Sequence, residues 1–230
     1  MKRFLGITFF ISFVGFGQQV TKTFDLHQVK ANLDSLKHAF GTHKSIPLEF
    51  EAPILVALSF YPELKQTTIV FRVKKTKTPL TSRPNFWGLF RNAKKRTYYV
   101  TLSEQSTPEL NPILFKNLDF NAQIGVIGHE LAHVSAYCTQ SLGGILRLGW
   151  IHLFSKKNVD AFENSTDRRC IQHGLGYQLL DWSIAVRTRL NRKEWRGVSN
   201  LSSPQHSSER YLNPDTIRAL IKENPLYGQQ

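Results

Sequence analysis

The segment from His129 to His133 constrains this chain of 230 residues more than any other part of it. It reads His-Glu-Leu-Ala-His, with Glu130 directly after the first histidine. Residues four apart project from one face of an α-helix, so the imidazoles of His129 and His133 can reach the same metal ion. Glu130 lies one step round the helix, where its carboxylate can meet a water molecule beside the metal. The segment therefore predicts a helix that presents a two-histidine metal site.

The surrounding residues support a helix that runs from Ala122 to Cys138. Asp119 or Asn121 can cap its start. Apolar residues recur at spacings of three and four and form one stripe for a hydrophobic core. The stripe consists of Ile124, Ile127, Leu131, Val134 and Cys138. His129 and His133 lie off this stripe, so they are not expected to be ordinary core histidines.

A zinc site needs a third protein ligand, and a second motif thirty residues beyond His133 supplies a candidate. Glu163 and Asp167 stand one helical turn apart, within an expected helix from Asp160 to His173. Together the two motifs resemble the gluzincin class of zinc metallopeptidases, in which a glutamate on a later helix completes the site in an E-x-x-(small)-D pattern. The resemblance covers residues 121–173. It implies that Glu163 is the third ligand and that Asp167 accepts a hydrogen bond from a ligand histidine.

The chain departs from the commonest gluzincin pattern in two respects. Thr166 stands at the small position, where the membrane-bound members usually have alanine. No long transmembrane span separates the two motifs. The resemblance therefore favours a small soluble gluzincin, and the residues after His133 lack the G-x-x-H continuation that is typical of metzincins.

The resemblance implies a zinc metallopeptidase that holds one Zn²⁺ per chain and hydrolyses peptide bonds in a peptide or protein substrate. Glu130 would be the general base, which takes a proton from a zinc-bound water as the water attacks the substrate carbonyl. A further donor for the oxyanion is expected, and the candidates are Tyr211, His206 and His173. Each of these three residues has a plain alternative role on the surface or in packing.

The alternative function is a zinc-stabilised, non-catalytic binding module that uses a basic face to contact anionic envelope components. Glu130 argues against it, because a structural zinc site needs a fourth ligand and not a free carboxylate.

The N-terminus has the form of a secretory signal peptide. Two basic residues precede an apolar run from Phe4 to Phe16, and small glycines before Gln18 suit cleavage there. An uncleaved anchor is the alternative, although the run is short for a membrane span. We expect residues 1–17 to be a signal peptide and residues 18–230 to form a single domain with no transmembrane span. The mature chain would then be periplasmic or secreted, in a bacterial source.

Cys138 and Cys170 are the two cysteines of the chain, one on each expected metal-binding helix. An even pair in an exported protein suggests a disulfide. The alternative is that both thiols are free, because Cys138 also completes the apolar stripe. The spacing alone does not decide between the two.

The formal net charge is +13, and the charge is unevenly spread. Ten lysines and arginines and no acidic residue lie between Leu64 and Ser103, with aromatic residues among them. A solvated basic face is the first explanation, and an anionic envelope surface or an acidic substrate is the next. Nucleic acid is not expected as a partner, since no binding motif accompanies the charge.

The fold expected is α+β, with a small, mostly antiparallel sheet followed by a zincin-type pair of metal-binding helices and C-terminal helices. The expected strands are Ile54–Leu58, Thr67–Val73 and Thr97–Leu102, with a loop from Lys74 to Arg96. The other expected helices are Gln28–Phe40, Tyr177–Arg192 and Asp215–Lys222, and the apolar run Leu142–Phe154 is expected to be a buried connecting helix or an interfacial segment. The resemblance implies that Tyr98–Leu102 is an edge strand able to pair with an extended substrate, although a plain structural strand is the alternative.

Overall fold

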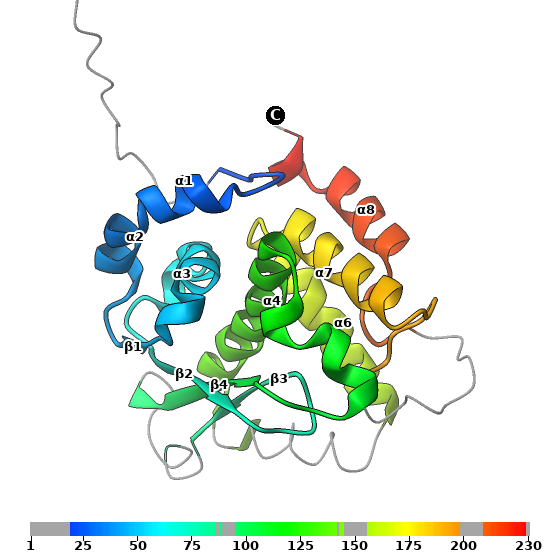
Figure 1. The fold of residues 1–230 in the computed structure, drawn as a ribbon, viewed down its shortest axis with the longest axis horizontal. Coiled ribbons are helices and arrows are strands. Elements are labelled where there is room, and N and C mark those ends of the chain that lie inside the picture. The colour runs from blue at the N-terminus through cyan, green and yellow to red at the C-terminus, as the bar shows by residue number, and fades with distance from the viewer. Residues whose placement is uncertain are drawn as a thin grey trace, which may run out of the picture.

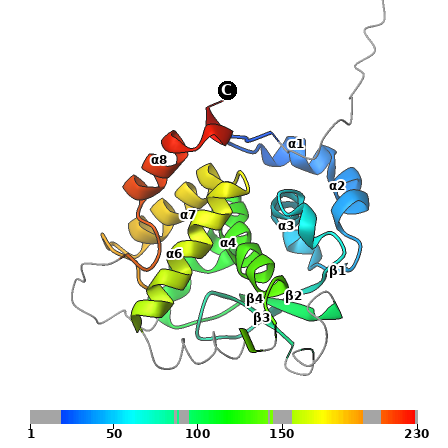
Figure 2. The same cartoon turned by 180° about the vertical axis from the view of Figure 1, so that it is seen from behind.

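The computed structural model describes residues 19–85, 88, 95–141, 143–144, 156–197 and 209–228. Helix α4 (Phe120–Cys138) runs through the middle of the molecule, with α3 (Glu51–Ser59) on one side of it and α7 (Gly176–Arg189) on the other (Figure 1). A small sheet lies across one end of these helices, and Figure 2 shows the same arrangement from behind. The expected α+β class is therefore confirmed.

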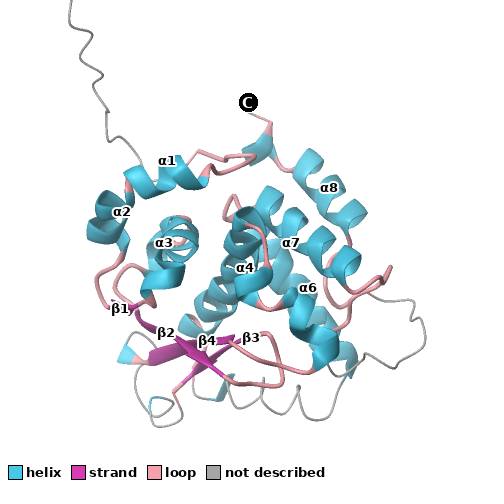
Figure 3. Cartoon of the chain, viewed as in Figure 1, coloured by secondary structure: helices cyan, strands magenta, loops and turns pink. Residues whose placement is uncertain are grey.

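The sheet has four strands in the order β1-β2-β4-β3 (Figure 3). They are β1 (Lys44–Ser45), β2 (Thr68–Lys74), β3 (Leu80–Pro84) and β4 (Thr97–Ser103). The β1–β2 and β2–β4 pairs are parallel and the β3–β4 pair is antiparallel, so the sheet is mixed and not mostly antiparallel. The expectations of strands near Thr67–Val73 and Thr97–Leu102 are confirmed.

The edge strand beside α4 is β3 and not β4, which lies between β2 and β3. The segment Lys74–Arg96 was expected to be a loop, and β3 corrects that expectation. The strand carries little apolar signal because only Leu80 is strongly hydrophobic and Pro84 ends it. Its stability comes from pairing with β4, where Leu80 lies opposite Leu102.

The expectation of a strand at Ile54–Leu58 is wrong, because this run belongs to α3. Every residue from Glu51 to Ser59 is buried. A run that is apolar on all sides carries neither the period of a strand nor that of a helix, so its pattern does not distinguish the two. Packing against α4 and against α2 (Leu33–Phe40) favours the helix here.

The remaining helices follow the expected positions closely. The segment expected as one helix at Gln28–Phe40 forms two, α1 (Leu26–Ala31) and α2, which meet at Asn32. The last helix, α8 (Pro214–Glu223), is capped by the Asn213 side chain, which accepts hydrogen bonds from the backbone N–H groups of residues 215 and 216. The second motif lies on α6 (Lys156–Gln172). Short 3₁₀ turns occupy Leu48–Phe50, Pro62–Leu64, Pro108–Ile113, Phe115–Asn117 and Pro225–Tyr227.

Two glycines on α4 let its neighbours approach closely. A Cβ atom at Gly125 would lie 2.0 Å from the Gln178 carbonyl oxygen of α7. A Cβ atom at Gly128 would lie 3.0 Å from the Cys170 sulfur of α6. A larger residue at either position would push one helix away. The glycines therefore fix the distance between α4 and the helices that complete the site.

The two cysteines are free, which corrects the suggestion of a disulfide between Cys138 and Cys170. Cys170 packs against Gly128, whereas Cys138 lies beside Thr67. Gly128 and Cys138 are ten residues apart on α4, which is about 15 Å along a helix. A disulfide needs Cα atoms within about 7 Å of each other, so the two thiols are out of reach.

Some of the expected segments lie outside the described residues. These are the signal peptide at residues 1–17 and, apart from residues 143–144, the apolar run Leu142–Phe154. None of the described helices is both long and apolar enough to cross a membrane.

Candidate metal centre

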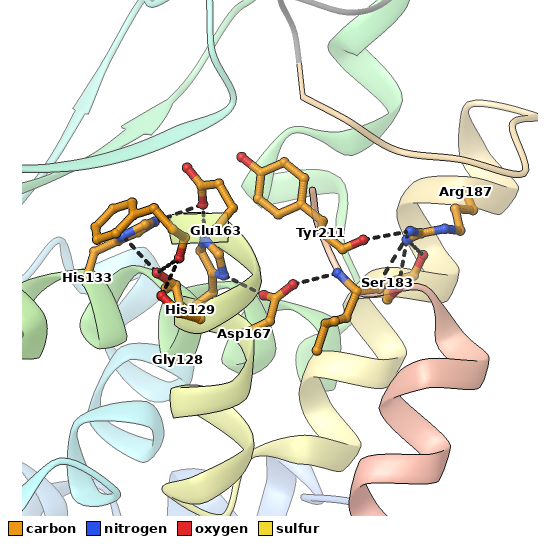
Figure 4. A network of polar contacts seen from close by, with 12 residues as sticks. Gly128, His129, His133, Glu163, Asp167, Ser183, Arg187 and Tyr211 are labelled. Carbon is orange, nitrogen blue, oxygen red and sulfur yellow. Dashed lines mark hydrogen bonds and ion pairs between the residues drawn. The ribbon is translucent and has the colours of Figure 1, made fainter. Parts of the chain in front are cut away.

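Three buried side chains from two helices meet at one point. His129 and His133 come from α4 and Glu163 comes from α6. The Nε2 atoms of both histidines lie 3.2 Å from the same Glu163 oxygen, Oε2 (Figure 4). The two imidazole rings are nearly perpendicular, at 88°. The structure thus brings together the three residues that the two motifs selected.

The geometry fits a small tetrahedral cation. A zinc ion with bonds of 2.0–2.1 Å keeps its ligand atoms about 3.3 Å apart, close to the two observed separations. The candidate ligand atoms all lie within 4.8 Å of one another. Two imidazole nitrogens and a carboxylate oxygen are also donors that zinc favours. Within the described parts of the chain, no other group of three His, Cys, Asp or Glu side chains is placed to hold a metal ion.

A second layer of hydrogen bonds orients both imidazoles. Asp167 Oδ1 lies 2.7 Å from His129 Nδ1. The Thr166 hydroxyl donates to the Phe162 carbonyl and lies 3.3 Å from His133 Nδ1. In each pair the oxygen can accept the Nδ1 proton, which leaves the Nε2 lone pair free for a metal. The threonine that departs from the usual gluzincin pattern therefore has an orienting contact that alanine could not make.

Charges compensate one another within this cluster. Burial alone would lower the pKa of His129, but the carboxylates of Asp167 and Glu163 outweigh it and raise that pKa well above its usual range. Burial would raise the pKa of Glu163, but His133 and His129 hold it far below its usual range. Without a metal, a proton on His129 thus balances these carboxylates, and a bound cation would supply that positive charge instead and displace the proton.

Glu130 has a different environment from these ligands. Its side chain is buried, and its Oε2 atom has no hydrogen-bond partner in the described structure. A buried polar atom without a partner is costly to fold, and a carboxylate costs more to bury than the hydroxyl and amide oxygens of Ser82, Thr107 and Gln178, which also lack a partner in the described structure. Glu130 is therefore placed to interact with a water molecule or a substrate.

A cleft of about 90 Å³ opens beside Glu130 and His129. Its walls come from the turn into β3, from α7, and from the segment after α7. The side chains that shape it are mainly apolar or aromatic, and they include Pro79, Leu80, Val126, Trp182, Val186, Trp195 and Tyr211. The cleft can therefore hold an apolar group next to the buried carboxylate.

The structure places one of the three candidate oxyanion donors at the site. The Tyr211 ring lies 5.6 Å from the His129 ring, on the same side as Glu163 in Figure 4. Burial raises the pKa of Tyr211 well above its usual range, and the carboxylates of Glu163 and Glu130 add to the rise. The phenol thus keeps its proton at neutral pH and can donate a hydrogen bond.

His173 is not at the site, so the expectation that it could serve there is wrong. Its Nε2 atom lies 3.0 Å from Glu63 Oε1, and its ring stacks on Tyr61 at 4.2 Å. The remaining candidate, His206, lies outside the described residues.

Sequence reasoning missed several residues that build the cleft and its support. Trp182 and Trp195 line it, and Arg187 holds the backbone of Tyr211 and Leu212. Trp182 and Arg187 stand at ordinary positions of a helix, where no spacing rule marks them as functional. The proximity of two of the four tryptophans to a predicted metal site could be found only after folding.

Comparison with known proteins returns no match. No protein-family model, curated protein or solved structure matches this chain. The case for a function therefore rests on the ligands, the partnerless carboxylate and the cleft.

Proposed function

We propose that this protein is an exported, zinc-dependent metallopeptidase of the gluzincin type. The observation that carries the proposal is the convergence of both histidine Nε2 atoms on Glu163 Oε2, each at 3.2 Å. The partnerless carboxylate of Glu130, directly beside this point, adds a candidate general base. A purely structural metal site would have no use for a free buried carboxylate.

The roles of the side chains follow from their contacts. His129, His133 and Glu163 would hold zinc, which when bound supplies a Lewis acid for the water and the substrate carbonyl. Glu130 takes a proton from the attacking water and passes it to the leaving amine. Tyr211 donates its hydroxyl proton in a hydrogen bond to the oxyanion.

The sheet and the cleft suggest how a peptide would be held. β3 ends the described sheet on the side of α4, so its outer edge can pair with an extended chain. Leu80 of β3 also lines the cleft, together with Trp182 and Trp195. A peptide on this edge would present a side chain to an apolar pocket. We therefore expect cleavage beside a hydrophobic residue.

The test combines metal analysis with one substitution. Purified mature protein should contain about one zinc per chain and should cleave members of a peptide library. Glu130→Gln should retain the metal and lose hydrolysis, because the amide cannot accept the proton. Glu223→Gln, at an exposed position on α8, is the matched control. Full activity in the Glu130→Gln protein would show that the assignment is wrong.

A second candidate function is attachment to an anionic envelope surface, and the sheet register favours it. Ile69 and Phe71 of β2 face the core, so the alternation of the strand puts Arg72 on the outer face. Tyr99 and Arg83 lie opposite each other on that face. The Arg72 guanidinium stacks over the Tyr99 ring at 4.1 Å, which holds it ready for an anion.

Binding to vesicles of anionic phospholipid tests this candidate. Neutralising Arg72, Lys74 and Arg83 with glutamine should weaken binding by about 100-fold, at about 1 kcal/mol for each charge. Neutralising Lys30, Lys116 and Lys222 removes the same charge from exposed positions elsewhere and should have a smaller effect. Equal losses in the two triple variants would count against a specific face.

A further inference from the structure

Arg187 is a buried cation of α7 that binds oxygen atoms from three parts of the chain. Only 9% of the residue is exposed. Its Nη1 donates to the Ser183 carbonyl at 3.1 Å and to the Ser183 hydroxyl at 2.7 Å. Its Nε donates to the Lys193 carbonyl at 3.1 Å. Its Nη2 donates to the carbonyls of Tyr211 and Leu212 at 3.4 and 3.5 Å.

These contacts hold both described ends of the segment that walls the cleft. The first end, residues 193–197, contains Trp195, and the second, residues 209–212, contains Tyr211. Asp160 of α6 holds the same two ends, since its carboxylate pairs with Arg196 and with Arg210. Side chains of α6 and α7 therefore both hold this segment, and Arg187 is the one that donates to the Tyr211 carbonyl itself.

A continuous set of hydrogen bonds connects Arg187 to the metal centre (Figure 4). The Leu212 N–H donates to Asp167 Oδ2 at 2.8 Å, while Asp167 Oδ1 orients His129. The Leu212 carbonyl accepts from the Ser183 hydroxyl at 2.9 Å, and Arg187 reaches the same carbonyl. The backbone of Tyr211 and Leu212 is thus held from α6 by Asp167 and from α7 by Arg187.

The charge of Arg187 is hard to explain by stability alone. Among the described residues, no carboxylate oxygen lies within 4 Å of its nitrogens. A buried ion with no carboxylate in direct contact is costly, although the more distant carboxylates of Asp167, Glu209 and Glu194 offset part of that cost. A well-packed apolar residue often stabilises a protein more. What an apolar residue could not do is hold several backbone carbonyls in one geometry.

We propose that Arg187 is a positioning residue that fixes Tyr211 against the metal centre for the reaction. The proposal rests on the proposed peptidase function and extends it to a residue outside the cleft. Because a misplacement of about 1 Å can cost about 100-fold in rate, loss of this clamp should lower the rate of hydrolysis. The metal ligands do not contact Arg187, so metal content should stay the same.

A double-mutant cycle with Tyr211 tests this role. Arg187→Gln should lower kcat by about 10- to 100-fold while metal content stays at the wild-type value. In a Tyr211→Phe background the same substitution should lower kcat by less than about threefold, because the hydroxyl that Arg187 positions is already absent. Equal losses in both backgrounds would overturn the proposal. Arg187→Lys keeps a donor and should recover part of the rate.

Arg189→Gln is the matched control for this cycle. Arg189 lies on the same helix and also donates to backbone carbonyls, those of Pro112 and Asn117, and it pairs with Asp119; none of these three residues lines the cleft. Its substitution should leave kcat within about twofold of wild type, and its effect on kcat should be the same with Tyr211 and with Tyr211→Phe. A loss in the Arg189→Gln protein that matches that of Arg187→Gln would overturn a specific role for Arg187.

Hydrogen exchange supplies a readout that does not depend on activity. In metal-free protein, Arg187→Gln should speed exchange in the peptide that contains Tyr211 and Leu212, and Arg189→Gln should not. Unchanged exchange in the Arg187→Gln protein would overturn the proposal. A wild type that hydrolyses no peptide would count against the peptidase function instead, and the exchange result would still decide whether Arg187 holds Tyr211. If Arg187→Gln does not fold, Arg187→Lys serves in both measurements.

Discussion

Two histidine–carboxylate clusters lie along the pair formed by α4 and α6, and only one of them has the features of a metal site. The metal cluster consists of His129, His133 and Glu163, whose side chains are 3%, 8% and 11% exposed. The Glu63 cluster consists of Glu63, Ser135 and His173, and its two ionisable side chains are 41% and 21% exposed. Both contain a short imidazole–carboxylate contact. Their difference lies in how many imidazoles meet one carboxylate oxygen.

In the metal cluster every Nδ1 atom has an oxygen partner, and both Nε2 atoms converge on one carboxylate oxygen. In the Glu63 cluster both nitrogens of His173 are already engaged, with the Arg169 carbonyl and with Glu63. Ser135 donates to the same Glu63 oxygen. That cluster therefore has a single imidazole, and a serine hydroxyl shares the carboxylate oxygen with it. Convergence of two buried imidazoles on one carboxylate oxygen, and not the presence of histidine and glutamate, therefore distinguishes the site.

The largest expected difference between the clusters is in metal content. His133→Ala should remove bound metal, because two remaining ligands do not hold zinc against dialysis. His173→Ala should retain about one metal ion per chain. Metal analysis of the two purified variants measures this directly. Loss of metal from the His173→Ala protein, with metal retained in the His133→Ala protein, would reverse our interpretation of the two clusters.

A smaller effect is expected from the residues that orient the ligands. Asp167→Asn keeps the shape of the side chain but removes the charge that holds His129, and it should weaken metal binding by about 10- to 100-fold. Glu63→Gln makes the same chemical change in the other cluster and should leave metal affinity unchanged. Competition with a chelator gives both affinities. Equal affinities of Asp167→Asn and wild type would show that the contact does not tune the metal.

The effect of Thr166 should be smaller again. Its hydroxyl is neutral and lies 3.3 Å from His133 Nδ1, at the long end for a hydrogen bond. Thr166→Val keeps the shape and should weaken metal binding by less than about tenfold, since a neutral hydrogen bond contributes about 1 kcal/mol. Ser135→Ala removes a hydroxyl from the Glu63 cluster and should not alter metal affinity. An effect of Thr166→Val as large as that of Asp167→Asn would contradict this ranking.

The contrast between the clusters also shows what the sequence can predict. Helical periodicity alone brings His129 and His133 to one face. The resemblance to gluzincins then selected Glu163 as the third candidate ligand. It also predicted that Asp167 would bind a ligand histidine. His173 was a plausible candidate by residue type, and only its contacts with Glu63 and Tyr61 remove it from the site.

The errors in the fold have a common physical cause. α3 is buried on all sides, and a uniform apolar run has no period to read. β3 is polar and short, and it forms because β4 supplies its hydrogen bonds. Both elements are decided by tertiary contacts between residues far apart in the chain. Arg187 was missed for the same reason, since its partners belong to segments that meet only in the folded protein.

The smallest predicted effect concerns the pH dependence of stability in the Glu63 cluster. Burial on its own would raise the pKa of Glu63, but hydrogen bonds from His173 and Ser135 outweigh it and lower that pKa. A carboxyl with a lowered pKa in the folded state stabilises the fold above its unfolded pKa of about 4.3, and this contribution disappears as the pH falls through the folded value. Urea unfolding of metal-free protein should therefore show that Glu63→Gln lowers the free energy of unfolding at pH 7. Because the Glu63 side chain is partly exposed, we expect a loss of less than about 1 kcal/mol. The difference from wild type should be smaller at pH 3 than at pH 7, because the contribution of the ionised carboxylate is lost as the pH falls. A deficit of the same size at both pH values would mean that Glu63 stabilises the fold through packing and not through its charge.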